Sequence, residues 1–124
     1  MSVRGIGGVF FKSKDPKALE KWYIENLGLK PDKEGYIYFM WSDLRKPGYT
    51  LWGPFPEDTK YFKPSDASWM INFVVDDIEK MVSTLKKNGV EVDERGVQKT
   101  EEGKFAWFID LEGNKIELWE PADK

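Results

Sequence analysis

Residues 105–121 read FAWFIDLEGNKIELWEP, and this stretch decides the fold. Two apolar runs flank a polar turn at residues 110–114, where the glycine and the asparagine tolerate the positive φ of a tight hairpin. In the second run Glu117 and Trp119 share one face of the strand, and the aliphatic residues share the other. The stretch therefore predicts a hairpin that presents a carboxylate and an indole to the same space. We expect whatever the protein binds to lie against that face.

A similar sequence motif occurs earlier in the chain. Residues 49–54 (YTLWGP) match residues 116–121 (IELWEP), and residues 8–15 match residues 70–77, each an apolar run that ends in Asp. Two copies about 60 residues apart predict a pair of modules and not a solenoid. We place these parts in a single domain, residues 1–124: module one at about 4–53, a connection at about 54–68, and module two at about 69–121.

The sequence of each module predicts the element order β-α-β-β-(β). In module one, Asp15 is expected to cap a helix that Pro16 begins and Gly28 ends. Strands are expected at residues 6–12, 36–41 and 49–52, with a turn at Lys46-Pro47-Gly48. The connection is longer than most loops, so it is expected to carry function or a short helical turn.

Module two repeats this plan. A strand at residues 69–75 precedes a helix that Asp77 caps and Gly89 stops. A short strand near residues 90–92 or 96–98 comes next, and the closing hairpin follows.

Composition excludes several classes of function. The net charge of −3 argues against a nucleic-acid-binding face, and no apolar run is long enough to span a membrane. No secretory signal is recognisable at the start, and cysteine is absent, so we expect a cytoplasmic protein without disulfides. Histidine is also absent, which removes the usual zinc, copper and iron ligands and the commonest general base. Six Trp, five Tyr and eight Phe can build a core or line a stacking cavity.

The motifs resemble those of the vicinal oxygen chelate superfamily, which includes lactoylglutathione lyase (glyoxalase), bleomycin-resistance proteins and extradiol dioxygenases. The resemblance rests on Asp15-Pro16 before the first helix with Gly28-Leu29 after it, on FVVDD at residues 73–77, and on DLEGNKIEL at residues 110–118. Leu111 departs from the proline that is usual in the last motif. The resemblance implies an α+β fold in which two β-α-β-β-β modules form a cupped, mostly antiparallel sheet with helices outside. It also implies a homodimer, because the family usually pairs modules across a two-fold axis.

Metal-using members of this superfamily hold a divalent ion with four side chains that point into the cup. Carried onto this sequence, these positions are Gly8, Thr50, Met70 and Glu117. Only Glu117 keeps a ligand, and one carboxylate does not make a site. We therefore expect no cofactor, with a divalent metal as the alternative.

The positions that face the cup give the candidate ligand-binding residues: Phe10, Thr50, Trp52, Met70, Asn72, Glu117 and Trp119. Trp52 and Trp119 are the best candidates for stacking, although large aromatics also build cores. Asn72 is a polar amide in an apolar strand, so it needs a ligand, a neighbouring strand or a buried water as partner. Glu117 is either a lone acid or base in an apolar cup or a carboxylate that is solvated or paired with a cation.

These observations favour a bleomycin-resistance-like protein that binds a small aromatic or amphipathic molecule without a metal. The alternative is a lyase, isomerase or dioxygenase-like enzyme of the same superfamily, acting through Glu117 or an unrecognised ion. A second alternative is a structural dimer that binds no ligand.

Overall fold

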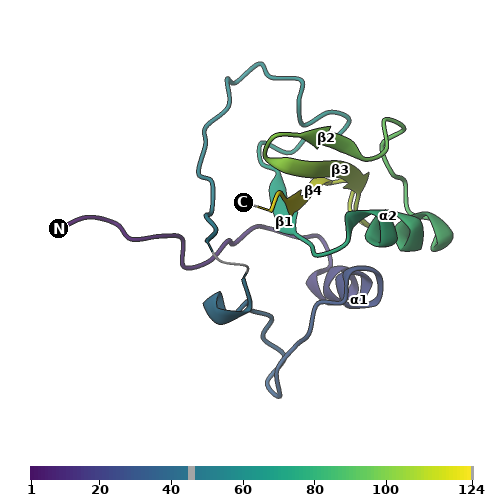
Figure 1. Ribbon diagram of the computed structural model, residues 1–124. Coiled ribbons are helices and arrows are strands. Elements are labelled where there is room, and N and C mark those ends of the chain that lie inside the picture. Colours follow the sequence, from purple (N-terminus) through teal and green to yellow (C-terminus); the bar gives the residue numbers. More distant parts are fainter. Residues whose placement is uncertain (45–46, 124) are drawn as a thin grey trace.

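The computed structural model describes residues 1–44 and 47–123, and it has the α+β class that the sequence predicts. Lys124 and the Lys46 position of the predicted turn lie outside the described residues. Figure 1 shows an open sheet with helices beside it and a long extended path through module one. The elements, in chain order, are α1 (Pro16–Leu27), the short 3-10 helix η1 (Trp41–Asp43), β1 (Ile71–Val74), α2 (Ile78–Lys87), β2 (Gln98–Thr100), β3 (Gly103–Ile109) and β4 (Lys115–Pro121).

Module two forms the sheet, and its elements follow the predicted β-α-β-β-β order. The strands are arranged β1-β4-β3-β2, with β1 parallel to β4 and the other neighbours antiparallel. Val92 forms an isolated bridge to Phe108 before β2 begins. The predicted strand near residues 90–92 is therefore reduced to this bridge, and the one near residues 96–98 overlaps the start of β2. In the register, Asn72 and Trp107 flank Glu117 from the two neighbouring strands.

Both helices begin where the sequence predicts and pack on one face of the sheet. The Asp15 and Asp77 carboxylates each accept a hydrogen bond, 3.1 Å long, from the backbone N–H three residues later. Gly28 ends α1 in the left-handed conformation, at φ 75°. The apolar stripes of the helices meet the aliphatic and aromatic side chains of β3 and β4 to form the core: Leu19, Tyr23, Ile78, Val82, Leu85, Ala106, Phe108, Ile116 and Leu118.

The closing hairpin forms as predicted, but its turn uses only one of the two expected residues. Gly113 has φ 83°, whereas no described residue other than glycine has a positive φ. Asn114 instead donates two hydrogen bonds to Asp110, one from its backbone N–H at 2.9 Å and one from its side-chain amide at 3.0 Å. Asp110 is buried, and it also accepts a hydrogen bond of 2.6 Å from the Tyr23 hydroxyl. The turn is therefore closed around a carboxylate that also holds α1.

A second carboxylate of the same turn holds the chain before α1. Glu112 accepts hydrogen bonds from the Ser13 hydroxyl at 2.8 Å and from the backbone N–H groups of Lys14 and Asp15 at 3.2 and 3.0 Å. These hydrogen bonds lower the pKa of Glu112, the one from the Asp15 N–H most strongly. The start of α1 is thus fastened to module two.

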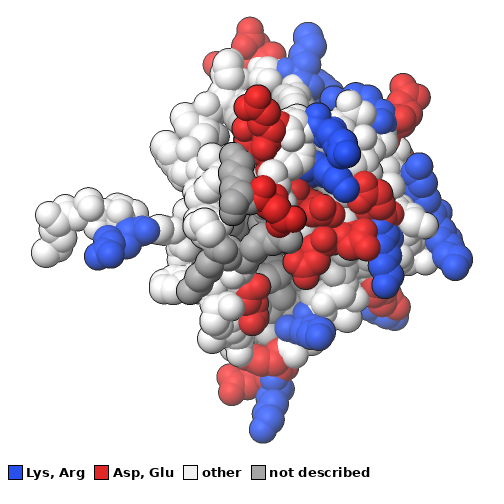
Figure 2. Space-filling view, in the orientation of Figure 1, with Lys and Arg blue, Asp and Glu red and all other residues white. Residues whose placement is uncertain are grey.

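The strands predicted in module one at residues 6–12, 36–41 and 49–52 do not form in the part of the chain that the structure describes. Residues 6–12 and 49–52 are extended without ladder partners, and residues 36–41 contribute one isolated bridge and the first residue of η1. Their alternating apolar pattern satisfies the local requirement for a strand, but a strand also needs a neighbour to bond. Their apolar side chains are consequently exposed, including Phe10 at 95% and Trp52 at 79%. In Figure 2 the left side of the molecule, where the extended path runs in Figure 1, carries few charged atoms.

Among the described residues, no helix is long and apolar enough to cross a membrane.

Candidate functional site

The face of the sheet away from the helices, here called the helix-free face, carries the predicted carboxylate and indole. Strand alternation and register place the following residues on it: Asn72, Val74, Phe105, Trp107, Lys115, Glu117 and Trp119. This set mixes aromatic rings with one cation, one carboxylate and one amide. It is the only face of the sheet that α1 and α2 leave uncovered in the described residues.

Three donors from three parts of the chain hold the Glu117 carboxylate. Oε1 accepts a hydrogen bond from the Asn72 amide at 2.7 Å. Oε2 accepts one from the Trp107 indole N–H at 2.9 Å and one from the Tyr61 hydroxyl at 2.5 Å. A carboxylate offers about four acceptor positions, so three donors occupy most of them. Glu117 is therefore fixed in orientation while remaining partly exposed, and it forms no ion pair with a cation among the described residues.

Tyr61 and Trp107 are the members of this group that are absent from the predicted site residues. Burial, followed by the hydrogen bond to Glu117 and the charge of Glu117, raises the pKa of Tyr61 to about 12. The phenol therefore keeps its proton at neutral pH and acts as a donor. Tyr61 lies in the connection between the modules, whose unusual length was the only sequence signal that pointed to it.

Aromatic rings lie on both sides of Glu117. Trp119 is 6% exposed, stacks on Phe105 at a centroid distance of 6.1 Å, and meets the Tyr49 ring at 5.3 Å. Its indole N–H donates to the Glu102 carbonyl at 2.8 Å, which fixes the ring. On the other side the Tyr61 ring stands edge-on to Trp107 at 6.3 Å. The helix-free face thus holds a fixed negative charge among packed aromatic rings, with Trp107 and Trp119 both buried.

The structure brings some of the predicted site residues together and leaves others apart. Asn72, Glu117 and Trp119 lie on the helix-free face, and Met70 is half-buried just before β1. Asn72 finds its partner on the neighbouring strand, in Glu117. Phe10, Thr50 and Trp52 are exposed on module one, and none of them contributes to the Glu117 hydrogen bonds.

The residues at the family's metal-binding positions do not fit a divalent ion. Gly8 has no side chain, Thr50 and Met70 offer a neutral hydroxyl and a thioether, and both Glu117 oxygens already accept hydrogen bonds. A separate carboxylate group, formed by Asp77, Glu79 and Glu120, lies at the start of α2.

That second group is already engaged. Lys104 Nζ lies 3.1 Å from Glu79 and 3.8 Å from Glu120. Glu120 also accepts a hydrogen bond from the Ile78 N–H at 2.9 Å. These contacts of the carboxylates hold the start of α2 against the sheet.

The chain belongs to the Glyoxalase/Bleomycin resistance protein/Dioxygenase superfamily, whose family model matches residues 5–118. This result confirms the resemblance that the sequence motifs indicate. No curated protein matches the chain in sequence.

Solved structures of this superfamily are similar to the chain over nearly its full length. TnmS3, an antibiotic binding protein from Streptomyces sp. CB03234, has a TM-score of 0.60 and 22% identity, with 98% of this chain and 99% of that chain covered. A glyoxylase/bleomycin resistance protein/dioxygenase domain from Frankia sp. EAN1pec also has a TM-score of 0.60, with 18% identity and coverage of 98% and 100%. At these identities the likeness shows the fold.

Proposed function

We propose that this chain binds a small aromatic or amphipathic molecule on the helix-free face without a metal ion, in the manner of bleomycin-resistance-like proteins. The observation that carries the proposal is the Glu117 carboxylate, held by three donors between aromatic rings. An apolar surface with a few fixed polar groups is the usual form of a small-molecule site. The similarity to TnmS3, an antibiotic binding protein, agrees with this proposal.

Orientation of a ligand is a better role for Glu117 than proton abstraction. Its acceptor positions are mostly engaged, and the nearby phenol is protonated at neutral pH, so neither group is poised as a base. The proposed ligand-binding residues on the helix-free face are Asn72, Glu117 and Trp119, to which Tyr61 and Trp107 are added. Phe10, Thr50, Trp52 and Met70 remain proposed as ligand contacts from outside this face.

Binding of a neutral planar probe tests this proposal. We expect 2-naphthamide to bind the wild-type chain in isothermal titration calorimetry. Trp119→Ala should weaken binding by about 1–3 kcal/mol through loss of aromatic contact. Glu117→Gln should cost at most about 1–3 kcal/mol, because a charged hydrogen bond becomes a neutral one.

Glu101→Gln, at an exposed turn position, is the matched control and should leave the affinity unchanged. Unchanged affinity in both Trp119→Ala and Glu117→Gln would mean that the probe does not use the helix-free face.

Metal independence predicts that the purified protein carries no stoichiometric transition metal. The chain offers neither His nor Cys, and three of the four family ligand positions hold no suitable side chain. Inductively coupled plasma mass spectrometry after dialysis should therefore find well under one equivalent of zinc, nickel, iron or copper. About one equivalent that survives dialysis would contradict the prediction, since tight retention requires several ligands.

We also propose that two copies of the chain form a homodimer that covers the exposed apolar side chains of module one. Phe10, Leu51 and Trp52 are each at least three-quarters exposed, and such surfaces are characteristic of interaction sites. β1, at one end of the sheet order, has a ladder with β4 and none with another described strand, so its outer edge is available for pairing.

Sedimentation velocity at tens of micromolar, about tenfold above a micromolar dissociation constant, should show a dimer. Leu51→Asp should shift the chain toward monomer by placing a charge in the contact. Leu111→Asp is the matched control, because Leu111 is also exposed but lies in the closing hairpin of module two. A wild-type monomer at this concentration would contradict the dimer.

The absence of cysteine and the net charge of −3 support two further parts of the proposal. The protein is proposed to work in the cytoplasm, where disulfides are rare. It is also proposed to have no nucleic-acid partner.

A further inference from the structure

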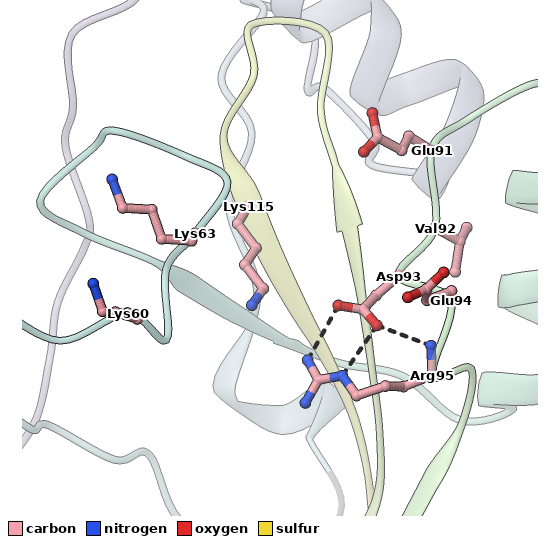
Figure 3. Close-up of a pocket in the computed structure, with 8 residues that line it drawn as sticks. All are labelled: Lys60, Lys63, Glu91, Val92, Asp93, Glu94, Arg95 and Lys115. Atoms are coloured by element: carbon pink, nitrogen blue, oxygen red, sulfur yellow. Dashed lines mark hydrogen bonds and ion pairs between the residues drawn. The ribbon is translucent and has the colours of Figure 1, made fainter.

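An open cavity of about 530 Å³ lies at the hairpin end of the helix-free face. One wall comes from the connection between the modules and the other from residues 91–95, and β4 lies between them (Figure 3). Lys60 and Lys63 stand on the first wall, and Glu91 and Glu94 stand on the second. Lys115 extends between the two walls.

Lys115 is the unusual member of this cavity, because it is only 5% exposed. Its ammonium donates one hydrogen bond, of 2.6 Å, to the Tyr61 carbonyl. It also lies 5.0 Å from the centroid of the Tyr61 ring and 5.8 Å from that of Trp107. No carboxylate of the described residues forms an ion pair with it, so a buried ammonium with three donors has one acceptor.

The other charges of the cavity do not satisfy Lys115. Asp93 is held by the Arg95 guanidinium, with N···O distances of 3.0 and 3.1 Å. Glu91 and Glu94 are exposed, so water and salt screen their charges. Burial, followed by the nearby Arg95 charge, lowers the pKa of Lys115, and the charges of Asp93 and Glu117 offset only part of this effect.

Two residues, Trp107 and Tyr61, each contact both a residue that lines the cavity and Glu117. Trp107 donates to Glu117 at 2.9 Å, and the Arg95 guanidinium lies 4.1 Å from the Trp107 ring centroid. Tyr61 holds Lys115 with its carbonyl and Glu117 with its hydroxyl. Lys115 also lies two residues before Glu117 on the same face of β4, so a molecule on the helix-free face has Lys115 near one end.

We propose that this cavity binds an anionic oxygen group, a carboxylate or a phosphate, carried by the small molecule whose aromatic part lies on the helix-free face, with Lys115 as its counter-ion. The inference rests on the proposed function and names the class of ligand: an aromatic acid. Lys60 supplies additional positive charge at the cavity, and Lys63, also at the cavity, is paired with Asp66.

Three probes that share one ring system test the inference by isothermal titration calorimetry: 2-naphthamide, 2-naphthoate and 2-naphthyl phosphate. The wild-type chain should bind at least one of the two anions about tenfold or more tightly than the amide, as expected for a charge-assisted hydrogen bond at a buried cation. The relative affinities of 2-naphthoate and 2-naphthyl phosphate identify the preferred anion. Lys115→Met should remove the preference, so that this variant binds the three probes with similar affinities. Lys99→Met, on the exposed strand β2, should preserve it.

The outcomes separate this inference from the proposed function. Equal binding of all three probes by the wild type would overturn the anion site and leave aromatic binding in place. A preference that survives in Lys115→Met would also overturn it, by showing that another cation is responsible. Binding of none of the probes would overturn the proposed function and this inference together. If Lys115→Met does not fold, the comparison of the three probes in the wild type still tests whether the site prefers an anion.

Discussion

Replacing Asp110 by alanine is expected to lower the free energy of unfolding by about 3 kcal/mol or more, because it leaves a buried hydroxyl and the hairpin donors without their acceptor. The Asp110 carboxylate accepts hydrogen bonds from the Tyr23 hydroxyl, from the Asn114 side chain, and from the N–H groups of Glu112 and Asn114. Burial and the adjacent carboxylate raise the pKa of Tyr23, so this phenol keeps its proton at neutral pH. Without Asp110, its buried hydroxyl would lose its acceptor. Urea denaturation followed by circular dichroism measures the loss.

Asp66→Ala is the matched control for that substitution. The Asp66 side chain is 96% exposed, and its contact with Lys63 is a surface ion pair of 3.4 Å. Such a change is expected to alter stability by no more than about 0.5 kcal/mol. If Asp110→Ala and Asp66→Ala were equally mild, the turn could not be organised by the Asp110 carboxylate.

Gly103→Ala is expected to be similarly damaging, at about 3–5 kcal/mol, because steric overlap and an unfavourable φ act together. Gly103 begins β3 with φ 129°, and a Cβ there would lie 2.2 Å from the Glu120 carbonyl oxygen and 2.7 Å from the Ala122 nitrogen. Those atoms belong to the backbone of the neighbouring strand and its continuation, so relief requires the pairing of β3 with β4 to open. Thermal denaturation measures the effect.

Gly113→Ala separates the two causes. Gly113 also has a positive φ, of 83°, but a Cβ there would meet nothing within 4 Å. Only the conformational cost remains, which is about 1–2 kcal/mol. A Gly103→Ala loss as small as that of Gly113→Ala would show that β4 yields to the added methyl group.

Local signals in the sequence predicted the parts of the fold that depend on local chemistry. The caps at Asp15 and Asp77 and the glycine stop at Gly28 act within one helical turn, so the residues alone define them. The alternation of β4 likewise placed Glu117 and Trp119 on one face without knowledge of any partner. The same alternation places Lys115, two residues before Glu117, on this face, so the sequence also carries a signal for the charged cavity.

The parts that were wrong or missed depend on partners distant in sequence. The apolar segments around Phe10 and Trp52 have a strand pattern, but a pattern supplies no neighbour, and none of the described strands pairs with them. Tyr61 reaches Glu117 from the connection between the modules, 56 residues away in sequence. No periodicity relates a loop side chain to a strand, so its role follows from tertiary structure alone.

The fastening of the first helix to the closing turn also determines when the protein can fold during its synthesis. Tyr23 meets Asp110 across 87 residues, and Ser13 meets Glu112 across 99. At a translation rate of about 5–20 residues per second, these groups wait roughly 4–20 s for their partners to be made. During that interval the apolar stripe of α1 has no sheet to cover it, because both central strands follow it in the chain. The nascent chain therefore exposes this apolar stripe until both strands have been made, which is the kind of transient surface that chaperones protect.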